Sequence, residues 1–191
     1  MSSAGQWAAT IASLVPFGSF AWAIPRHFEC RGPMPRGMRV LSLFSLAAYA
    51  SFIGLVMLRH PHADTPLIGP GLICFVAATL LFWWAIRTTT TKRLSIAYKK
   101  VDPDLIVAAG PYAWIRHPFY TSYILFWVGT GFIAGGWQWA LALVLMVWYL
   151  RIARDEERFF ERSGLSAGYA AYRRRTGMLI PVPPLLRRQQ H

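Results

Sequence analysis

Long apolar runs constrain the fold of this chain more than any other feature of its sequence. A helix that spans a bilayer needs about 20 predominantly apolar residues, within a range of roughly 17 to 25. Three runs fall in that range, and they cover Trp7 to Ile24, Val40 to Leu58 and Leu67 to Ile86. Charged residues make up only 15% of the chain, below the roughly 25% that is usual in soluble domains. The pattern therefore predicts an all-α integral membrane protein.

Two shorter apolar runs follow, from Phe119 to Ala134 and from Trp137 to Leu150. Only Gly135 and Gly136 separate them, and a Gly pair is typical of a tight turn. We expect about five transmembrane helices in all, with the last two forming a helical hairpin. The fifth helix is expected to continue past Leu150 into a polar stretch, followed by a cytoplasmic helical segment at the C-terminal end.

The basic residues indicate how these spans are oriented. With five spans and the N-terminus outside, 19 of the 20 Lys and Arg residues fall on the cytoplasmic side, and only Arg59 lies outside. The positive-inside rule favours this arrangement, which also puts the C-terminus in the cytoplasm. The net charge of +12 is then explained by topology and by membrane lipids, and no nucleic-acid partner is required.

A cluster of polar groups stands where the fourth run begins, in the stretch GPYAWIRHPFYTSY at residues 110–123. Its Gly-Pro pair is typical of a turn. Pro118 fits the first turn of a helix, and Arg116 and His117 would lie at its mouth, where free N–H groups attract carboxylates. Arg and Tyr at a helix end often serve only as interfacial anchors. Gly-Pro-Tyr joined to Arg-His-Pro-x-Tyr is less easily explained in that way.

A second polar stretch, RIARDEERFFERSG, occupies residues 151–164 and holds half of the eight acids. On a continuing helix, Arg151, Arg154 and Glu157 are spaced three residues apart and can share one face. Ion pairs of Glu157 and Glu161 with arginines of the same helix would explain the pattern equally well. Further on, Tyr-x-x-Tyr and several prolines suggest either a flap over a pocket or an interfacial helix.

The combination of GPY-x-x-x-RHP-x-Y, a downstream Glu-Glu pair, Tyr-x-x-Tyr and a later Pro resembles the isoprenylcysteine carboxyl methyltransferase family and its phospholipid methyltransferase-like relatives. The resemblance covers about Asp104 to Pro181, roughly 40% of the chain. It implies an integral membrane methyltransferase that uses S-adenosylmethionine and acts on a lipophilic or lipid-linked acceptor. It also implies a cytoplasmic cofactor pocket roofed by the C-terminal segment.

The family's cofactor-binding positions transfer to ten residues of this chain. They are Asp104, Leu105, Ile106, Val107, Tyr112, His117, Pro118, Phe119, Tyr120 and Glu157. Such residue types suit the cofactor, because aromatic faces stabilise a sulfonium and a carboxylate accepts from an ammonium or from ribose hydroxyls. No metal site is expected.

The acceptor half of the site departs from the family, whose acceptor-binding arginine corresponds to Ala153 here. Arg151 and Arg154 flank that position and are the candidates to replace it, so that either could orient a prenylcysteine-type carboxylate. If the acceptor is an amine or a thiol, a base must remove a proton, and Glu156 or His117 are the candidates.

These expectations divide the chain into three N-terminal spans, residues 1–86, and a catalytic cofactor-binding region, residues 87–191, made of connector, hairpin and C-terminal segment. Two other classes remain open. One is an NADPH-dependent, sterol- or enone-reductase-like membrane enzyme, for which the basic run at residues 173–175 could receive a 2′-phosphate. The other is a non-catalytic membrane protein that binds headgroups. The Glu-Glu pair favours a cationic cofactor.

Overall fold

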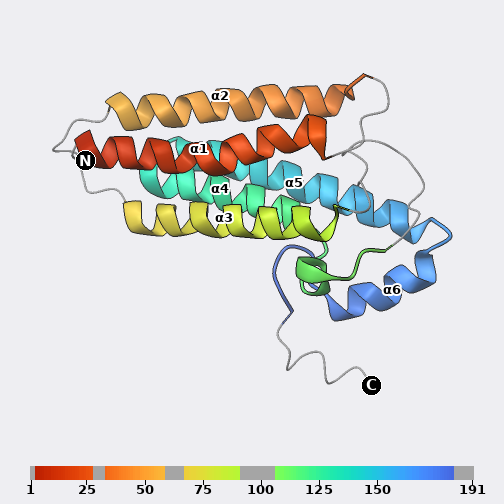
Figure 1. The fold of residues 1–191 in the computed structure, drawn as a ribbon. Helices are drawn as coiled ribbons and strands as arrows, with labels where there is room; N and C mark the ends of the chain where they lie inside the picture. Colours follow the sequence, from red (N-terminus) through yellow and green to blue (C-terminus); the bar gives the residue numbers. More distant parts are fainter. Residues whose placement is uncertain (1–2, 28–32, 59–66, 91–105, 183–191) are drawn as a thin grey trace.

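Helices make up the regular structure of the residues that the computed structural model describes, which are 3–27, 33–58, 67–90 and 106–182. They are α1 (Ser3–Arg26), α2 (Arg36–Leu58), α3 (Ile68–Thr88), the 3₁₀ helix η1 (Gly110–Ala113), α4 (Pro118–Ala134), α5 (Gln138–Glu161) and α6 (Ser166–Arg175). The long helices α1 to α5 lie side by side in a bundle, and α6 lies beside one end of it (Figure 1). The described part of the chain is therefore all-α, as the sequence predicted.

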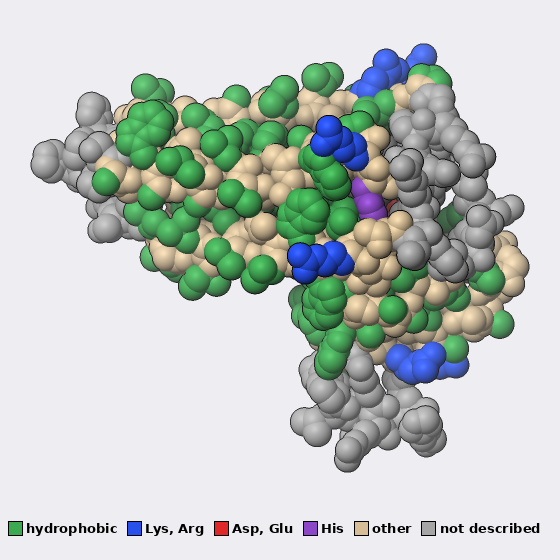
Figure 2. Space-filling model, in the orientation of Figure 1, with side chains coloured by type: hydrophobic (Ala, Val, Ile, Leu, Met, Phe, Trp, Pro, Cys, Tyr) green, Lys and Arg blue, Asp and Glu red, His purple; other side chains and the backbone are tan. Residues whose placement is uncertain are grey.

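Three of the described helices are long and apolar enough to cross a membrane, namely Ala4–Arg26, Arg36–Leu58 and Ile68–Thr88. Their outward surfaces are apolar as well, since Leu43 and Ile73 are 68% and 69% exposed. Apolar side chains cover the body of the bundle, whereas the Lys and Arg side chains visible in Figure 2 lie toward the end that carries α6. The chain is a multi-pass membrane protein.

The helices α4 and α5 follow one another closely and pack together. Both Gly135 and Gly136 between them have positive φ, at 65° and 53°, a conformation that glycine adopts without steric cost. The rings of Phe132 and Trp139 meet across this turn at 5.0 Å. As predicted, α5 continues beyond Leu150, where it leaves its apolar part and enters the polar stretch.

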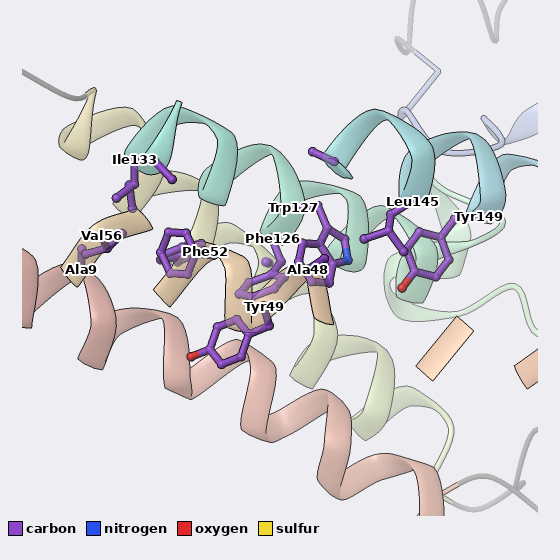
Figure 3. Packing of buried hydrophobic residues seen from close by; sticks show 14 of the residues in the cluster. Ala9, Ala48, Tyr49, Phe52, Val56, Phe126, Trp127, Ile133, Leu145 and Tyr149 are labelled. Atoms are coloured by element: carbon purple, nitrogen blue, oxygen red, sulfur yellow. The ribbon is translucent and has the colours of Figure 1, made fainter. Parts of the chain in front are cut away.

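The bundle is held together by a largely aromatic core. Figure 3 shows Tyr49, Phe52 and Phe126 pointing into the space between the helices, where the two phenylalanines are fully buried. Tyr49 stacks on Phe17 with ring centroids 4.0 Å apart, and its hydroxyl is paired with that of Ser13 at 2.9 Å. Buried polar atoms of α1 and α2 are thus satisfied across the helix interface, as a membrane interior requires.

The helices α3 and α4 approach each other closely. A Cβ on Gly129 of α4 would lie 2.8 Å from Phe75 of α3, so the two backbones can approach this closely only because the residue is glycine. At the other end of this pair, the last part of α3 packs against η1 and the start of α4. The residues of both sequence motifs meet at this end.

Candidate functional site

The turn at η1 buries the tyrosine of the Gly-Pro-Tyr motif. Gly110 has a φ of 55°, and a Cβ there would collide with the side chain of Thr88. The turn leaves Tyr112 only 7% exposed, packed among Phe82, Phe119 and neighbouring apolar residues. Within the part of the chain that the structure describes, the Tyr112 hydroxyl has no hydrogen-bond partner. An unpartnered buried hydroxyl is costly, so this atom is a candidate for contact with a ligand.

The helix α6 holds this turn in place. The Tyr172 hydroxyl donates to the main-chain carbonyl of Tyr112 at 2.7 Å. The Thr176 hydroxyl in turn donates to the carbonyl of Tyr172 at 2.8 Å. Burial raises the pKa of Tyr112 well above its ordinary value, so this phenol stays protonated and can donate a hydrogen bond.

A buried ion cluster joins the Arg-His-Pro motif to the Glu-Glu motif of α5. The Arg116 Nε donates to Glu157 Oε1 at 2.7 Å, and His117 Nε2 lies 3.3 Å from the same oxygen. The second oxygen, Oε2, lies 4.0 Å from Arg173 Nε. Both close contacts thus fall on Oε1, whereas Oε2 faces only the more distant Arg173 guanidinium and keeps capacity to accept a hydrogen bond from a ligand.

The pKa values of this cluster favour its ionised form. Burial acts to raise the pKa of Glu157, but hydrogen bonds from His117 and Arg116 and their charges outweigh it and lower the pKa to about 2. Burial acts to lower the pKa of His117, but hydrogen bonds and charges from Glu156 and Glu157 outweigh it and raise the pKa. The structure thus favours a carboxylate at Glu157 and an imidazolium at His117.

Glu156, the neighbour of Glu157, faces a group of tyrosines. The Tyr120 hydroxyl donates to Glu156 Oε1 at 2.6 Å. The ring of Tyr120 stacks with that of Tyr149 at 5.9 Å, and Tyr123 lies 5.3 Å from Tyr149. The arrangement combines a negative charge with several aromatic faces, both of which attract cations.

The chain after α6 folds back against the loop that precedes α4, beside η1 (Figure 1). The main-chain N–H of Arg116 donates to the carbonyl of Gly177 at 2.8 Å. The main-chain N–H of His117 donates to the carbonyl of Met178 at 3.1 Å. The Arg116 side chain also donates to the carbonyls of Arg173 and Thr176. The C-terminal segment therefore lies against the ion cluster, consistent with a roof over it.

The structure brings most of the predicted cofactor residues to this end of the bundle. Phe119 packs in the cluster around Tyr112, and Val107 packs against that cluster. Pro118 occupies the first turn of α4 and is buried. Ile106 approaches α6, since a Cβ on Gly168 would meet it at 3.4 Å. The other two predicted positions, Asp104 and Leu105, lie outside the described residues.

The structure does not bring Arg151 and Arg154 into the cluster. Both side chains are exposed, whereas Ala153 and Glu157 are buried on another side of α5. At about 100° per residue, Arg154 is turned about 60° away from Glu157, and Arg151 about 120°. Along this helix we expected Glu157 or Glu161 to pair with an arginine of α5, but the local pair that the structure shows is Asp155 with Arg158 at 3.2 Å. Glu161 instead pairs with Arg173 of α6.

Several contributing residues were not evident from the sequence. The sequence placed Arg116 at the mouth of α4, as an anchor or as part of the motif, but it did not predict the bonds of Arg116 to Glu157 and to the C-terminal segment. Tyr149 lies within an apolar run, and no motif signals that it meets Tyr120. His27, at the end of α1, is buried beside Thr89 with Nε2 2.9 Å from its hydroxyl, and its ring lies 6.1 Å from that of Phe119. A pairing between α1 and α3 has no local sequence signal.

Fold and site together define a class: a multi-pass helical membrane protein with a tyrosine and carboxylate cluster at one end of its bundle. Comparison with known proteins shows which family part of the chain is similar to. Residues 71–161 match the model of the isoprenylcysteine carboxyl methyltransferase (ICMT) family. The family predicted from the motifs is thereby confirmed for this part of the chain.

One curated relative is the protein-S-isoprenylcysteine O-methyltransferase of Schizosaccharomyces pombe, which is 30% identical over 92 residues. The match covers 47% of this chain and 38% of the relative, so the chain spans less than half the length of that protein. No solved structure matches the chain.

Proposed function

We propose that this chain is an integral membrane methyltransferase that uses S-adenosylmethionine and methylates a lipophilic or membrane-associated acceptor. The observation that carries the proposal is the contact of Arg116 and His117 with Glu157, because it joins the two motifs into one buried cluster. All three residues lie within the segment that matches the family. The name of the yeast relative, an O-methyltransferase, supports the same class of reaction.

The residues present fit S-adenosylmethionine. The orphaned hydroxyl of Tyr112 can donate to the cofactor, and Glu157 Oε2 can accept from an ammonium or a ribose hydroxyl. The faces of Tyr112 and Tyr120 suit a sulfonium. When bound, the cofactor supplies an electrophilic methyl group on a positively charged sulfur. Of the remaining candidates, Ile106, Val107, Pro118 and Phe119 would supply apolar walls, with Asp104 and Leu105 assigned only from the family motif.

Methyl transfer is a displacement in line with the breaking bond, so it depends on alignment and on exclusion of water more than on a strong acid or base. The main-chain bonds between Arg116 and Gly177, and between His117 and Met178, hold the C-terminal segment against the cluster. In this proposal the segment excludes water from the site, and the Tyr172 hydroxyl keeps η1 in position.

The membrane arrangement is part of the proposal. We take α4 and α5 as a fourth and fifth span that form a hairpin around Gly135 and Gly136. The N-terminus lies outside, and the C-terminal region lies in the cytoplasm, as the positive-inside rule favours. Residues 1–86 then form the N-terminal spans, and residues 87–191 form the catalytic region, open to soluble cofactor on one side and to lipid on another.

The test compares two ligands with the full chain purified in detergent. Calorimetry is expected to detect binding of S-adenosylhomocysteine and none of NADPH. Binding of NADPH alone would favour the reductase-like class instead. If neither ligand binds, a non-catalytic headgroup-binding protein becomes the better explanation.

A further inference from the structure

We infer that the end of α6 and the chain that follows it dock on the surface of the membrane that the bundle spans. Apolar side chains of residues 176–182 enter the lipid interface, and arginines at the end of α6 bind anionic headgroups. The docking itself is independent of the reaction. Its consequence for the site, that the membrane holds the roof in place over the cofactor, rests on the proposed function.

Tryptophan and arginine side chains mark where the lipid interface crosses this end of the bundle. Trp84 of α3 is exposed, and the exposed Arg87 follows one turn later. On α1, the guanidinium carbon of Arg26 lies over the ring of Trp22, 5.8 Å from its centroid. Tryptophan and basic residues near the end of a spanning helix are typical of the headgroup level of a bilayer. The last turns of α1 and α3 therefore lie at that level.

The chain after α6 reaches back to the level of the last turns of α3, to one side of the bundle rather than beyond its end (Figure 1). Hydrogen bonds hold it there. The main-chain N–H of Gly177 donates to the carbonyl of Trp114 at 3.1 Å, and the Thr121 hydroxyl of α4 donates to the carbonyl of Leu179 at 2.9 Å. A segment held to one side of a spanning bundle, at the level of the headgroups, lies against the lipid interface.

Several side chains of this region that are exposed are apolar. Ile180 is 78% exposed, and Pro181 and Trp114 are exposed as well. Figure 2 shows hydrophobic side chains gathered at the place that the chain after α6 occupies in Figure 1. Large apolar side chains that are unfavourable in water are stabilised at the boundary between headgroups and acyl chains. The exposure of Ile180 is therefore explained by contact with lipid.

The charge beside these apolar side chains is positive. Arg174 and Arg175 end α6, and both are exposed. From residue 162 to residue 191 the sequence holds six arginines and no Asp or Glu. Apolar side chains combined with a basic cluster are typical of a segment that lies on an anionic membrane surface. An acidic protein would match the charge, but it would not account for Ile180 at the level of the interface.

Docking bears on the site because the same residues form its roof. The carbonyls of Gly177 and Met178 accept the main-chain bonds from the loop before α4. A lipid contact that is made when the segment lies against this loop shifts the population toward the closed arrangement. Since the proposed function places the cofactor under this roof, anionic lipid should strengthen cofactor binding.

A spin label tests the docking without any cofactor. Ile180→Cys and Gly164→Cys are labelled separately in the full chain, with Cys30 and Cys74 replaced by alanine, in nanodiscs of phosphatidylcholine with about 30% phosphatidylglycerol. Gly164 lies between α5 and α6, and nothing lies within 4 Å of its Cβ position. The label at position 180 should meet oxygen, which concentrates in lipid, more than a water-soluble nickel chelate. The label at position 164 should show the reverse. Equal access of the chelate to both positions overturns the docking.

Calorimetry with S-adenosylhomocysteine tests the headgroup contact and its effect on the roof. The Kd of the wild type should be lower by about threefold or more with phosphatidylglycerol than in phosphatidylcholine alone, and salt should reduce the difference. The double variant Arg174→Gln with Arg175→Gln should lose it. Arg158→Gln with Arg162→Gln makes the same change of charge at exposed positions of α5, beyond the end of α3, and should keep it (Figure 1).

The outcomes separate the inference from the proposed function. A lipid effect that is absent from the wild type, or that survives in the Arg174 and Arg175 variant, overturns the headgroup contact. Tighter binding caused by poly-L-glutamate in phosphatidylcholine nanodiscs would identify an acidic protein as the partner and overturn the lipid assignment. If the wild type binds no S-adenosylhomocysteine in either membrane, the proposed function fails, and the label at position 180 alone decides the docking.

Discussion

The Nε atom of Arg116 lies 2.7 Å from Oε1 of Glu157, and both side chains are only 9% exposed. The contact joins the loop before α4 to the polar end of α5. Because the same guanidinium donates to carbonyls of the C-terminal segment, one side chain ties three parts of the chain together. Removing one partner of a buried pair leaves an uncompensated charge, so this relationship has measurable consequences.

Arg116→Ala is expected to lower the free energy of unfolding by about 3 kcal/mol, because Glu157 would lose its main counter-charge. Thermal or denaturant unfolding in detergent measures the change. The double variant Arg116→Ala with Glu157→Ala should be less destabilised than the sum of the two single variants, by about 1 to 3 kcal/mol. The exposed pair of Asp155 and Arg158 is the control, with a coupling under about 1 kcal/mol. Additive losses at Arg116 and Glu157 would show that the pair does not couple.

Tyr112→Phe is expected to separate stability from binding. The Tyr112 hydroxyl is buried without a partner among the described residues, so its removal should leave the Tm without ligand unchanged or raise it. If the hydroxyl donates to the cofactor, affinity for S-adenosylhomocysteine should fall about fivefold to tenfold. Tyr172→Phe is the matched control, since that hydroxyl donates to the Tyr112 carbonyl and its loss should lower the Tm. Unchanged affinity in Tyr112→Phe would remove this residue from the site.

Stability should depend on pH on both the acid and the alkaline side. The pKa of Glu157 is lowered to about 2 from 4.5, so its contribution is present above 4.5 and is lost as the pH falls toward 2. The pKa of His117 is raised from 6.5, so its contribution is present below 6.5 and is lost as the pH rises through the folded-state value.

Unfolding measured between about pH 3 and pH 9 should therefore show the greatest contribution of this cluster at mildly acidic pH. Glu157→Gln should reduce the loss of stability at acid pH, and His117→Gln should reduce the loss of stability at alkaline pH. A wild-type Tm that rises above neutral pH relative to that of His117→Gln would contradict the ionised cluster.

The turn after α6 should tolerate no side chain at Gly177, because a Cβ there would collide with the carbonyl oxygen of Ile180. Gly177→Ala is expected to displace the C-terminal segment from the loop before α4. Limited proteolysis should then cut this segment faster, and affinity for S-adenosylhomocysteine should fall. Gly164→Ala is the control, since nothing lies within 4 Å of its Cβ position. Equal cleavage of both variants would argue against a roof formed by this segment.

The sequence predicted the features that depend on local pattern. Apolar runs locate the long helices, Pro118 marks the start of α4, and the continuation of α5 past Leu150 follows from its unbroken helical sequence. The two motifs also predicted that His117, Tyr120 and Glu157 would meet. His117, Tyr120 and Glu157 all lie within residues 71–161, the segment that matches the family model.

Pairings between distant segments were not predictable in this way. Nothing in the local sequence distinguishes Arg116 as a partner of Glu157 from Arg116 as a lipid anchor, because the difference lies in how α4 and α5 are placed. The spacing of Arg151, Arg154 and Glu157 predicted that the three side chains share one face of α5. In the structure Glu157 is buried, whereas Arg151 and Arg154 are exposed. Three-residue spacing leaves about 60° between neighbours, enough to separate a buried acid from an exposed base.

The central claim is that the cluster around Glu157 binds S-adenosylmethionine, and titration calorimetry with S-adenosylhomocysteine tests it most directly. The wild-type chain and Asp155→Asn should bind with the same Kd. Glu157→Gln should weaken binding about tenfold or more, since a hydrogen bond to a charged group contributes about 1.5 to 3 kcal/mol. Equal affinity in all three proteins, or no binding by the wild type, would contradict the assignment of this cluster.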